Sequence, residues 1–111
     1  MNDYLPKVYT EFRERYRSVS EAQGDLARAV REATPFDERT SRLVKLALAI
    51  GAQADGAVRS NVRKGLEVGL NVEEIRAVSL HAITTCGFPT AIAGLRWIED
   101  VLQGEGLEDS N

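Results

Sequence analysis

The sequence is poor in the residues that build metal and thiol sites, with one histidine and one cysteine among its 111 residues. A zinc site takes about three or four nitrogen or sulfur ligands from the protein, so His81 and Cys86 alone do not supply one. A single cysteine also has no partner for an intrachain disulfide. The scattered glycines form no G-x-G-x-x-G or Walker pattern. These absences predict neither a metal site nor a nucleotide cofactor.

An excess of positive charge and long apolar runs are absent as well. The chain carries 14 basic and 17 acidic residues, whereas nonspecific nucleic-acid binding depends mainly on cationic side chains that neutralise phosphates. Its longest apolar stretch, Leu46 to Ala52, is much shorter than the ~20 residues that span a bilayer. The first residues also lack the pattern of a secretion signal. We therefore expect a cytoplasmic protein that binds neither nucleic acid nor membranes.

What the sequence does contain is apolar residues at helical spacing along nearly its whole length. No segment alternates with period two, and the three prolines fall at the edges of predicted elements. The pattern predicts one all-α domain, residues 1–111, with about six helices and a flexible tail at 104–111. Because so short a chain buries a limited share of its surface alone, association with further copies is favoured.

Capping residues place the first predicted boundaries. Asp3 is expected to cap the first helix, and Asp37 is expected to cap a third helix that runs to about Ala54. Ser18 and Ser20 each precede a glutamate or glutamine by three residues, which is the spacing of a capping box for the second helix.

Glycine and asparagine mark the later boundaries. A fourth helix is expected to follow the turn at Asp55-Gly56 and to stop at Gly69. Asn71 and Glu74 have the spacing of a capping box that opens a fifth helix. The segment Cys86-Gly87-Phe88-Pro89 separates this helix from the sixth.

Two of the predicted helices have more apolar surface than one core requires. The third is apolar almost all round from Leu43 to Ala54, and the sixth carries a second stripe, Trp97 and Val101, beside its main one. Since a core covers one face of a helix, we expect these helices to lie in the middle of the fold or at an interface between subunits.

Four side chains stand out as candidates for function. His81 lies beside the apolar stripe of the fifth helix, as either a general acid–base in a cavity or a hydrogen-bonded structural histidine. Cys86 ends that helix, where the helix dipole disfavours a thiolate, so it is either structural or reactive. Asn61 either binds a ligand or ties helices together, and Arg42 either holds a carboxylate or lies on the surface.

From Asp37 to about Trp97 the sequence resembles the carboxymuconolactone decarboxylase family, which includes the alkylhydroperoxidase D-like proteins. The resemblance rests first on the segment NVRKGLEVGLNVEEI, which is similar to the family's pattern of a helix, a glycine and a capped helix. The other is LHAITTCGFPTA, which contains the Gly-x-Pro turn. The resemblance implies an alkylhydroperoxidase D-like helical fold and a homo-oligomer, either a trimer or a hexamer.

The peroxidase branch of this family uses a C-x-x-C pair, a histidine after it and a glutamate before it. The corresponding positions here are Ala54 and Ala57 for the cysteines, Asn61 for the histidine and Arg42 for the glutamate. Alanine forms neither a thiolate nor a disulfide, and neither asparagine nor arginine is a general base. The comparison therefore argues against a dithiol peroxidase mechanism.

The decarboxylase branch is the nearer one, because it lacks the cysteine pair and carries a histidine before its Gly-x-Pro turn, as His81, Gly87 and Pro89 do here. The chain departs from that branch at Asn61, where a histidine is usual, and near Cys86, where a tyrosine is common.

This resemblance implies a lyase-type reaction without a cofactor on a small lactone or carboxylic acid, in a pocket between the third, fourth and fifth helices. Arg42 or Arg59 would orient a carboxylate, His81 would move a proton, and Asn61 would hydrogen-bond the ligand. Two other hypotheses stay open: a non-catalytic helical binding or assembly protein with a decayed site, and an antioxidant peroxide reductase that uses Cys86.

Overall fold

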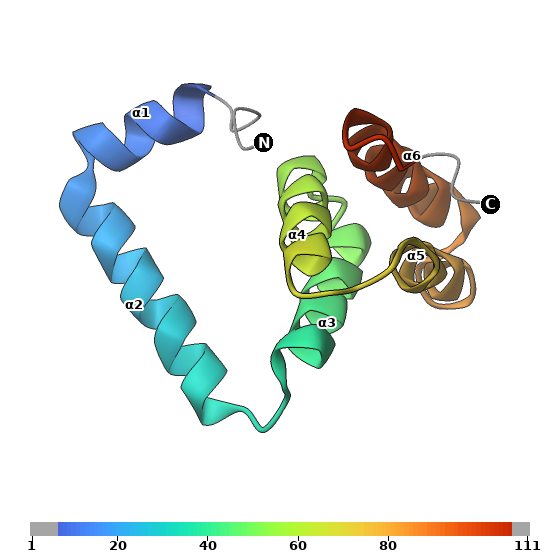
Figure 1. Ribbon diagram of the computed structural model, residues 1–111, viewed down its shortest axis with the longest axis horizontal. Helices are drawn as coiled ribbons and strands as arrows, with labels where there is room; N and C mark the ends of the chain where they lie inside the picture. Colours follow the sequence, from blue (N-terminus) through green and yellow to red (C-terminus); the bar gives the residue numbers. More distant parts are fainter. Residues whose placement is uncertain (1–6, 108–111) are drawn as a thin grey trace. The chain divides into compact units, whose positions relative to one another are not determined.

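The computed structural model describes residues 7–107, and within this range it contains six α-helices and no strand (Figure 1). The prediction of an all-α fold is therefore confirmed. The chain divides into two compact units, residues 1–35 and 36–111. No helix in the described range is long and apolar enough to cross a membrane. The helices are α1 (Lys7–Arg15), α2 (Arg17–Ala33), α3 (Glu38–Gly51), α4 (Asp55–Glu67), α5 (Val72–Cys86) and α6 (Phe88–Gly104).

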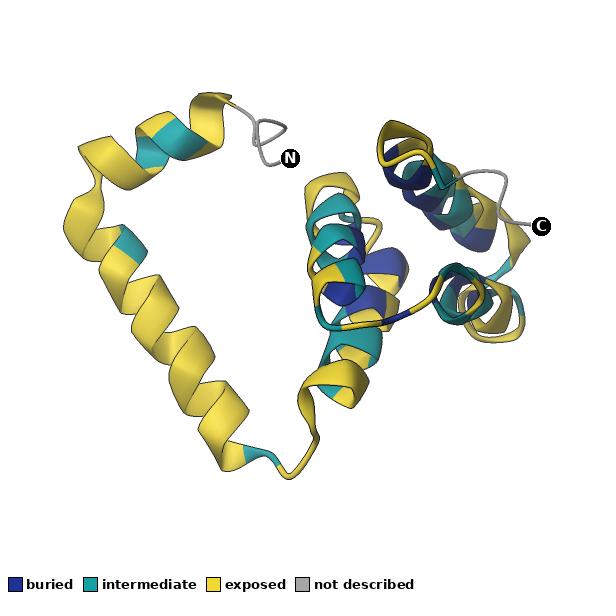
Figure 2. Ribbon diagram, viewed as in Figure 1, coloured by how far each residue is buried: buried dark blue, intermediate teal, exposed yellow. Residues whose placement is uncertain are grey.

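The first unit consists of α1 and α2, and neither helix contains a buried residue. Figure 2 shows both helices as almost entirely exposed. Two ring contacts join neighbouring turns: the Phe12 and Tyr16 ring centroids are 5.4 Å apart, and the Arg13 guanidinium lies 5.3 Å from the centre of the Tyr9 ring. In its described part, the unit therefore has no core of its own.

The start of α2 differs from the prediction. Ser18 and Ser20 lie inside the helix, and the N-cap residue Tyr16 makes no side-chain capping bond. The reason is that backbone carbonyl groups accept the hydrogen bonds at this helix start. The amide of Tyr16 donates to the carbonyl oxygen of Phe12, and the amide of Ser20 donates to that of Tyr16. No capping box is needed to satisfy these amides. Asp3, the predicted cap of the first helix, lies outside the described residues.

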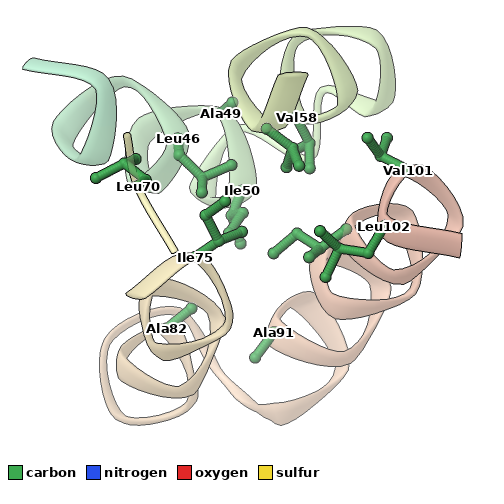
Figure 3. Packing of buried hydrophobic residues seen from close by; sticks show 12 residues of the cluster. Leu46, Ala49, Ile50, Val58, Leu70, Ile75, Ala82, Ala91, Val101 and Leu102 are labelled. Atoms are coloured by element: carbon green, nitrogen blue, oxygen red, sulfur yellow. The ribbon is translucent and has the colours of Figure 1, made fainter. Parts of the chain in front are cut away.

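The second unit packs α3, α4, α5 and α6 around one apolar core (Figure 3). α3 pairs with α4 and α5 pairs with α6, while α6 also contacts α3 and α4. Ile50, Ile75, Ile98 and Leu102 are fully buried, and burial of each such side chain contributes about 1.5–3 kcal/mol. The core therefore fixes the position of α3 relative to α5, the two helices that form the candidate site.

Three predicted boundaries in this unit are confirmed. The Asp37 Oδ1 atom accepts a hydrogen bond of 2.8 Å from the amide of Thr40 and caps α3. Asn71 and Glu74 form the reciprocal capping box of α5, with hydrogen bonds of 2.8 and 2.9 Å. Gly69 follows the end of α4 with a φ of 95°, a left-handed conformation that favours glycine.

Other ends of the helices differ from expectation. α3 ends at Gly51 instead of about Ala54, because the chain turns at Gln53, which has a positive φ of 56°.

The second stripe of α6 packs inside the unit, where Val101 is buried and Trp97 lies against the core, since α6 meets α4 as well as α5. Beyond α6, Leu107 also packs against the core, and residues 108–111 lie outside the described range.

Candidate functional site

An open groove of about 660 Å³ lies between α3 and α5. One wall contains Leu43, Ala47 and Leu48 of α3, and the other contains Val78 and Ala82 of α5. Leu43 and Ala47 are four residues apart, as are Val78 and Ala82, which places each pair on one face of its helix, and Leu48 adjoins Ala47. No aspartate, glutamate, lysine or arginine lines the groove. It is therefore a weakly polar space in which a few polar atoms dominate the electrostatics.

The polar side chains of the groove all come from the last turns of α5. His81, Thr85 and Cys86 line it and are exposed. The hydroxyl groups of Thr84 and Thr85 donate to the backbone oxygen of His81, at 3.4 and 2.7 Å. Within residues 7–107, no hydrogen bond or ion pair holds the imidazole of His81. Its exposure does not fit a buried structural histidine, so the ring is available to a ligand in the groove.

Cys86, the last residue of α5, lines the groove near Gly51, the last residue of α3. A Cβ atom added to Gly51 would lie 3.5 Å from the Cys86 Sγ atom, so the thiol packs close to the backbone of α3. The side chain is exposed, and it is the single cysteine of the chain. The thiol is therefore accessible in the isolated chain.

Arg42 and Asn61 meet on a different surface, between α3 and α4. The Arg42 Nη1 atom donates to Asn61 Oδ1 at 2.8 Å, and Asn61 Nδ2 donates to the backbone oxygen of Ala57 at 2.9 Å. The Arg42 Nε atom is buried and makes no hydrogen bond. The two positions that correspond to the peroxidase glutamate and histidine are thus neighbours in space, and Asn61 ties α4 to α3.

Positive charge gathers around this pair. The pKa of Lys64 lies below its usual value, first because of burial and then because of the neighbouring charges of Arg42, Lys45 and Arg63, while Glu67 acts in the opposite direction. These side chains belong to α3 and α4 and do not line the groove. The cationic surface and the apolar groove are therefore separate features of the unit.

Arg59 is engaged by two carboxylates. It donates to Asp55 within α4 and, at 3.0 Å, to Asp100 of α6. Burial lowers the pKa of Arg59, but the hydrogen bonds to Asp55 and Asp100 outweigh that effect and raise it overall. The guanidinium links α4 to α6, and a ligand carboxylate would have to compete with both acidic partners.

The structure therefore brings together two of the five predicted site residues in the groove. His81 and Cys86 line it, Arg42 and Asn61 contact each other elsewhere, and Arg59 lies in a third place. The expected pocket between the third, fourth and fifth helices is instead lined by α3 and α5. The reason is helix geometry: side chains of α3 that face α4 cannot also face α5.

Sequence reasoning missed the walls of the groove and both carboxylate partners of Arg59. The wall formed by α3 could have been predicted, because this helix is apolar almost all round. The core covers one face of it and leaves Val44 and Leu48 exposed. The spacing of four residues between Asp55 and Arg59 indicates their pairing, whereas Asp100 is distant in sequence.

In the described part of the chain, no cluster of three or more histidine, cysteine, aspartate or glutamate side chains could hold a metal.

Comparisons with known proteins agree with this architecture. The sequence model of the carboxymuconolactone decarboxylase family matches residues 17–100. The fold is similar to the crystal structure of an apo carboxymuconolactone decarboxylase family protein from Legionella pneumophila, with a TM-score of 0.70 and 22% identity over 84% of this chain and 86% of that chain. No curated protein matches the sequence. Because the family match spans α2 to α6, the chain belongs to the carboxymuconolactone decarboxylase family.

Proposed function

We propose that the groove between α3 and α5 binds a small lactone or carboxylic acid and that His81 takes part in a decarboxylation without a cofactor. The observation that carries this proposal is the exposed imidazole of His81 in a groove that no aspartate, glutamate, lysine or arginine lines. Membership of the carboxymuconolactone decarboxylase family supports the reaction class.

The apolar lining suits the loss of carbon dioxide for a physical reason. The reaction breaks a carbon–carbon bond and leaves the electron pair on the substrate, where a conjugated lactone carbonyl spreads the charge. A compact carboxylate is poorly solvated beside Leu43, Ala47 and Val78, whereas the spread charge of the transition state needs less solvation. Transfer from water into the groove therefore favours the transition state over the bound acid.

Loss of carbon dioxide leaves an electron pair that is delocalised over the conjugated lactone and takes up a proton, and delivery of this proton is the task of His81. A protonated imidazole donates it and is left neutral, and solvent restores the lost proton when the product leaves. Cys86 is available to the lactone oxygens, whereas the Thr85 hydroxyl already donates its proton to the backbone oxygen of His81. In this proposal neither Arg42 nor Arg59 orients the carboxylate, because both are engaged on other surfaces.

The test is carbon dioxide release from γ-carboxymuconolactone by the purified protein and by His81→Ala. Loss of a proton donor reduces turnover by about 10²–10⁴-fold, so we expect release by the wild type and near-background release by the variant. Leu80→Ala is the matched control, because this exposed neighbour on α5 does not line the groove, and it should retain wild-type turnover. Release that is unchanged in His81→Ala would contradict the assigned role, and absent wild-type release would contradict the proposed reaction.

A further inference from the structure

We propose that Arg42 and Lys64 bind a phosphoryl dianion, either the phosphate group of a small molecule or the free ion, on a cationic surface between α3 and α4. This surface comprises Arg42 and Lys45 of α3 and Arg63 and Lys64 of α4. None of these side chains lines the groove between α3 and α5, so the proposal does not depend on the reaction assigned to that groove.

The side chain of Arg42 is held at two points. Its Nη1 atom donates to Asn61 Oδ1 at 2.8 Å, and Asn61 is itself fixed by a hydrogen bond of 2.9 Å to the backbone oxygen of Ala57. Its stem packs against α4 at Gly65, where an added Cβ atom would lie 3.5 Å from Arg42 Cγ. The guanidinium is therefore positioned before any ligand binds, which reduces the entropy that binding costs.

The other edge of this guanidinium lacks an acceptor. Nε is buried without a hydrogen bond, and among residues 7–107 no atom accepts a hydrogen bond from Nη2. Arg76 shows what the same edge can do, since its Nε and Nη2 atoms donate to the two carboxylate oxygens of Glu99 at 2.7 and 2.9 Å. An oxyanion at Arg42 would bind first at Nη2, and a small rotation of the guanidinium would bring the covered Nε to a second oxygen.

Lys64 provides the second cation of the site. It follows Asn61 by three residues and so lies on the same side of α4, and its side chain is exposed. The other three cations of this surface act on Lys64 with like charge, whereas Glu67 carries the opposite charge. The ammonium group is thus accessible to a ligand and lies in a region of positive potential.

Arg42 and Lys64 differ from other cations of the second unit in having no carboxylate partner. Arg39, Arg59 and Arg76 each form an ion pair with an acidic side chain. In the part of the chain that the structure describes, neither Arg42 nor Lys64 forms one. Since like charges repel, an anion between these two side chains would replace repulsion by attraction.

A phosphoryl group suits this surface better than a carboxylate. It carries about two negative charges near neutral pH and has about three strong acceptor oxygens, so it can accept from the Arg42 guanidinium and the Lys64 ammonium at the same time. A long polyanion such as nucleic acid is disfavoured, because the chain as a whole has a formal net charge of −3. The ligand is therefore a small phosphorylated molecule or phosphate itself.

Titration of the full chain with inorganic phosphate at constant ionic strength tests the proposal. We expect saturable binding, with a dissociation constant at least about tenfold lower than that for acetate, and shifts of backbone amide signals near Asn61 and Gly65 in NMR spectra. Glycerol 3-phosphate distinguishes the two sources, since tighter binding than inorganic phosphate identifies an ester as the ligand and weaker binding identifies the free ion. Binding that does not saturate by ~50 mM phosphate, or equal affinity for acetate, would overturn the proposal.

Lys64→Gln and Arg42→Lys test the two contacts separately. Each should raise the dissociation constant for phosphate at least about tenfold, because the first removes a charge and the second keeps the charge but loses the planar fork of donors. Arg96→Gln is the matched control, because Arg96 is exposed on α6 and its loss changes the net charge by the same amount as Lys64→Gln. Equal weakening by Arg96→Gln would show a general effect of charge and contradict the assigned site.

Thermal unfolding gives an independent measurement. Phosphate at about 100 times its dissociation constant should raise the thermal midpoint of the wild type by several degrees through mass action, and the shift should be much smaller for Lys64→Gln at the same concentration. Lys64 is exposed, so this variant should keep its fold, which circular dichroism measures. A folded Lys64→Gln protein with the wild-type shift would show that phosphate binds elsewhere.

Discussion

Gly94 determines how closely α6 approaches α3. A Cβ atom at this position would lie 2.9 Å from Cγ2 and 3.0 Å from Cγ1 of Ile50. Ile50 is fully buried in the apolar core, so its branched side chain has little room to yield. The sequence shows only a glycine inside a predicted helix, where it costs about 1 kcal/mol relative to alanine. The packing explains why glycine is nevertheless suitable here.

Gly94→Ala should therefore destabilise the protein although alanine is the better helix former. Overpacking of a dense core costs about 1–3 kcal/mol, which exceeds the gain in helix propensity. Urea unfolding would measure the change in the free energy of unfolding. Gly104→Ala is the control in the same helix, because a Cβ atom there meets nothing within 4 Å. A Gly94→Ala protein as stable as the wild type would show that Ile50 can move.

The start of α5 shows how an element is fixed by both local and distant contacts. Asn71 and Glu74 satisfy each other's backbone amides, and Arg39 of α3 donates to the Glu74 carboxylate at 2.7 Å. The pKa of Glu74 is lowered from its usual 4.5, first by the hydrogen bond with the Asn71 backbone and then by Arg39. The helix start and its attachment to α3 thus depend on one ionised carboxylate.

This lowered pKa predicts how stability changes with pH. The folded state binds the Glu74 proton less tightly than the unfolded state, so the carboxylate stabilises the fold above its usual pKa of 4.5, and this contribution is lost as the pH falls through the lowered value. Glu74→Gln should be less stable than the wild type near neutral pH. Its free energy of unfolding, measured with urea, should also fall less steeply than that of the wild type as the pH is lowered from about 7 to about 3. Glu73→Gln, which alters the adjacent carboxylate of the same turn, should retain the wild-type slope.

At the scale of the whole molecule, the two units differ in how many buried residues stabilise them. The second unit contains all the buried residues of the described range, whereas α1 and α2 contain none (Figure 2). Because so short a chain buries a limited share of its surface alone, we expect it to gain stability when copies associate and cover exposed apolar residues such as Leu26 and Leu48. Assembly and folding should therefore be coupled.

Such coupling predicts a thermal midpoint that depends on protein concentration. Mass action stabilises an associated native state as concentration rises, and a hundredfold increase should raise the midpoint by roughly 5 °C. Circular dichroism melts across that range would measure it. Leu26→Glu should abolish the dependence, and Glu32→Gln should preserve it. Identical wild-type midpoints at all concentrations would show that the folded monomer is the stable species.

The sequence by itself determined the all-α class, the family resemblance and the main caps. Asp37, Gly69 and Asn71 were predictable because a cap acts on amides and carbonyls within a few residues of itself. The pair of Asp55 and Arg59 follows the same local rule. His81 and Cys86 are close in sequence, so a helix that contains both places them near each other at its C-terminal end.

Only the tertiary structure decided which face of each helix meets which neighbour. It separated His81 from Arg42, because Arg42 faces α4 while the groove opens between α3 and α5. It also paired Arg59 of α4 with Asp100 of α6. An apolar stripe shows that a helix must be covered, but the identity of the cover depends on contacts between residues far apart in the chain, and those contacts follow from the packing of the whole core.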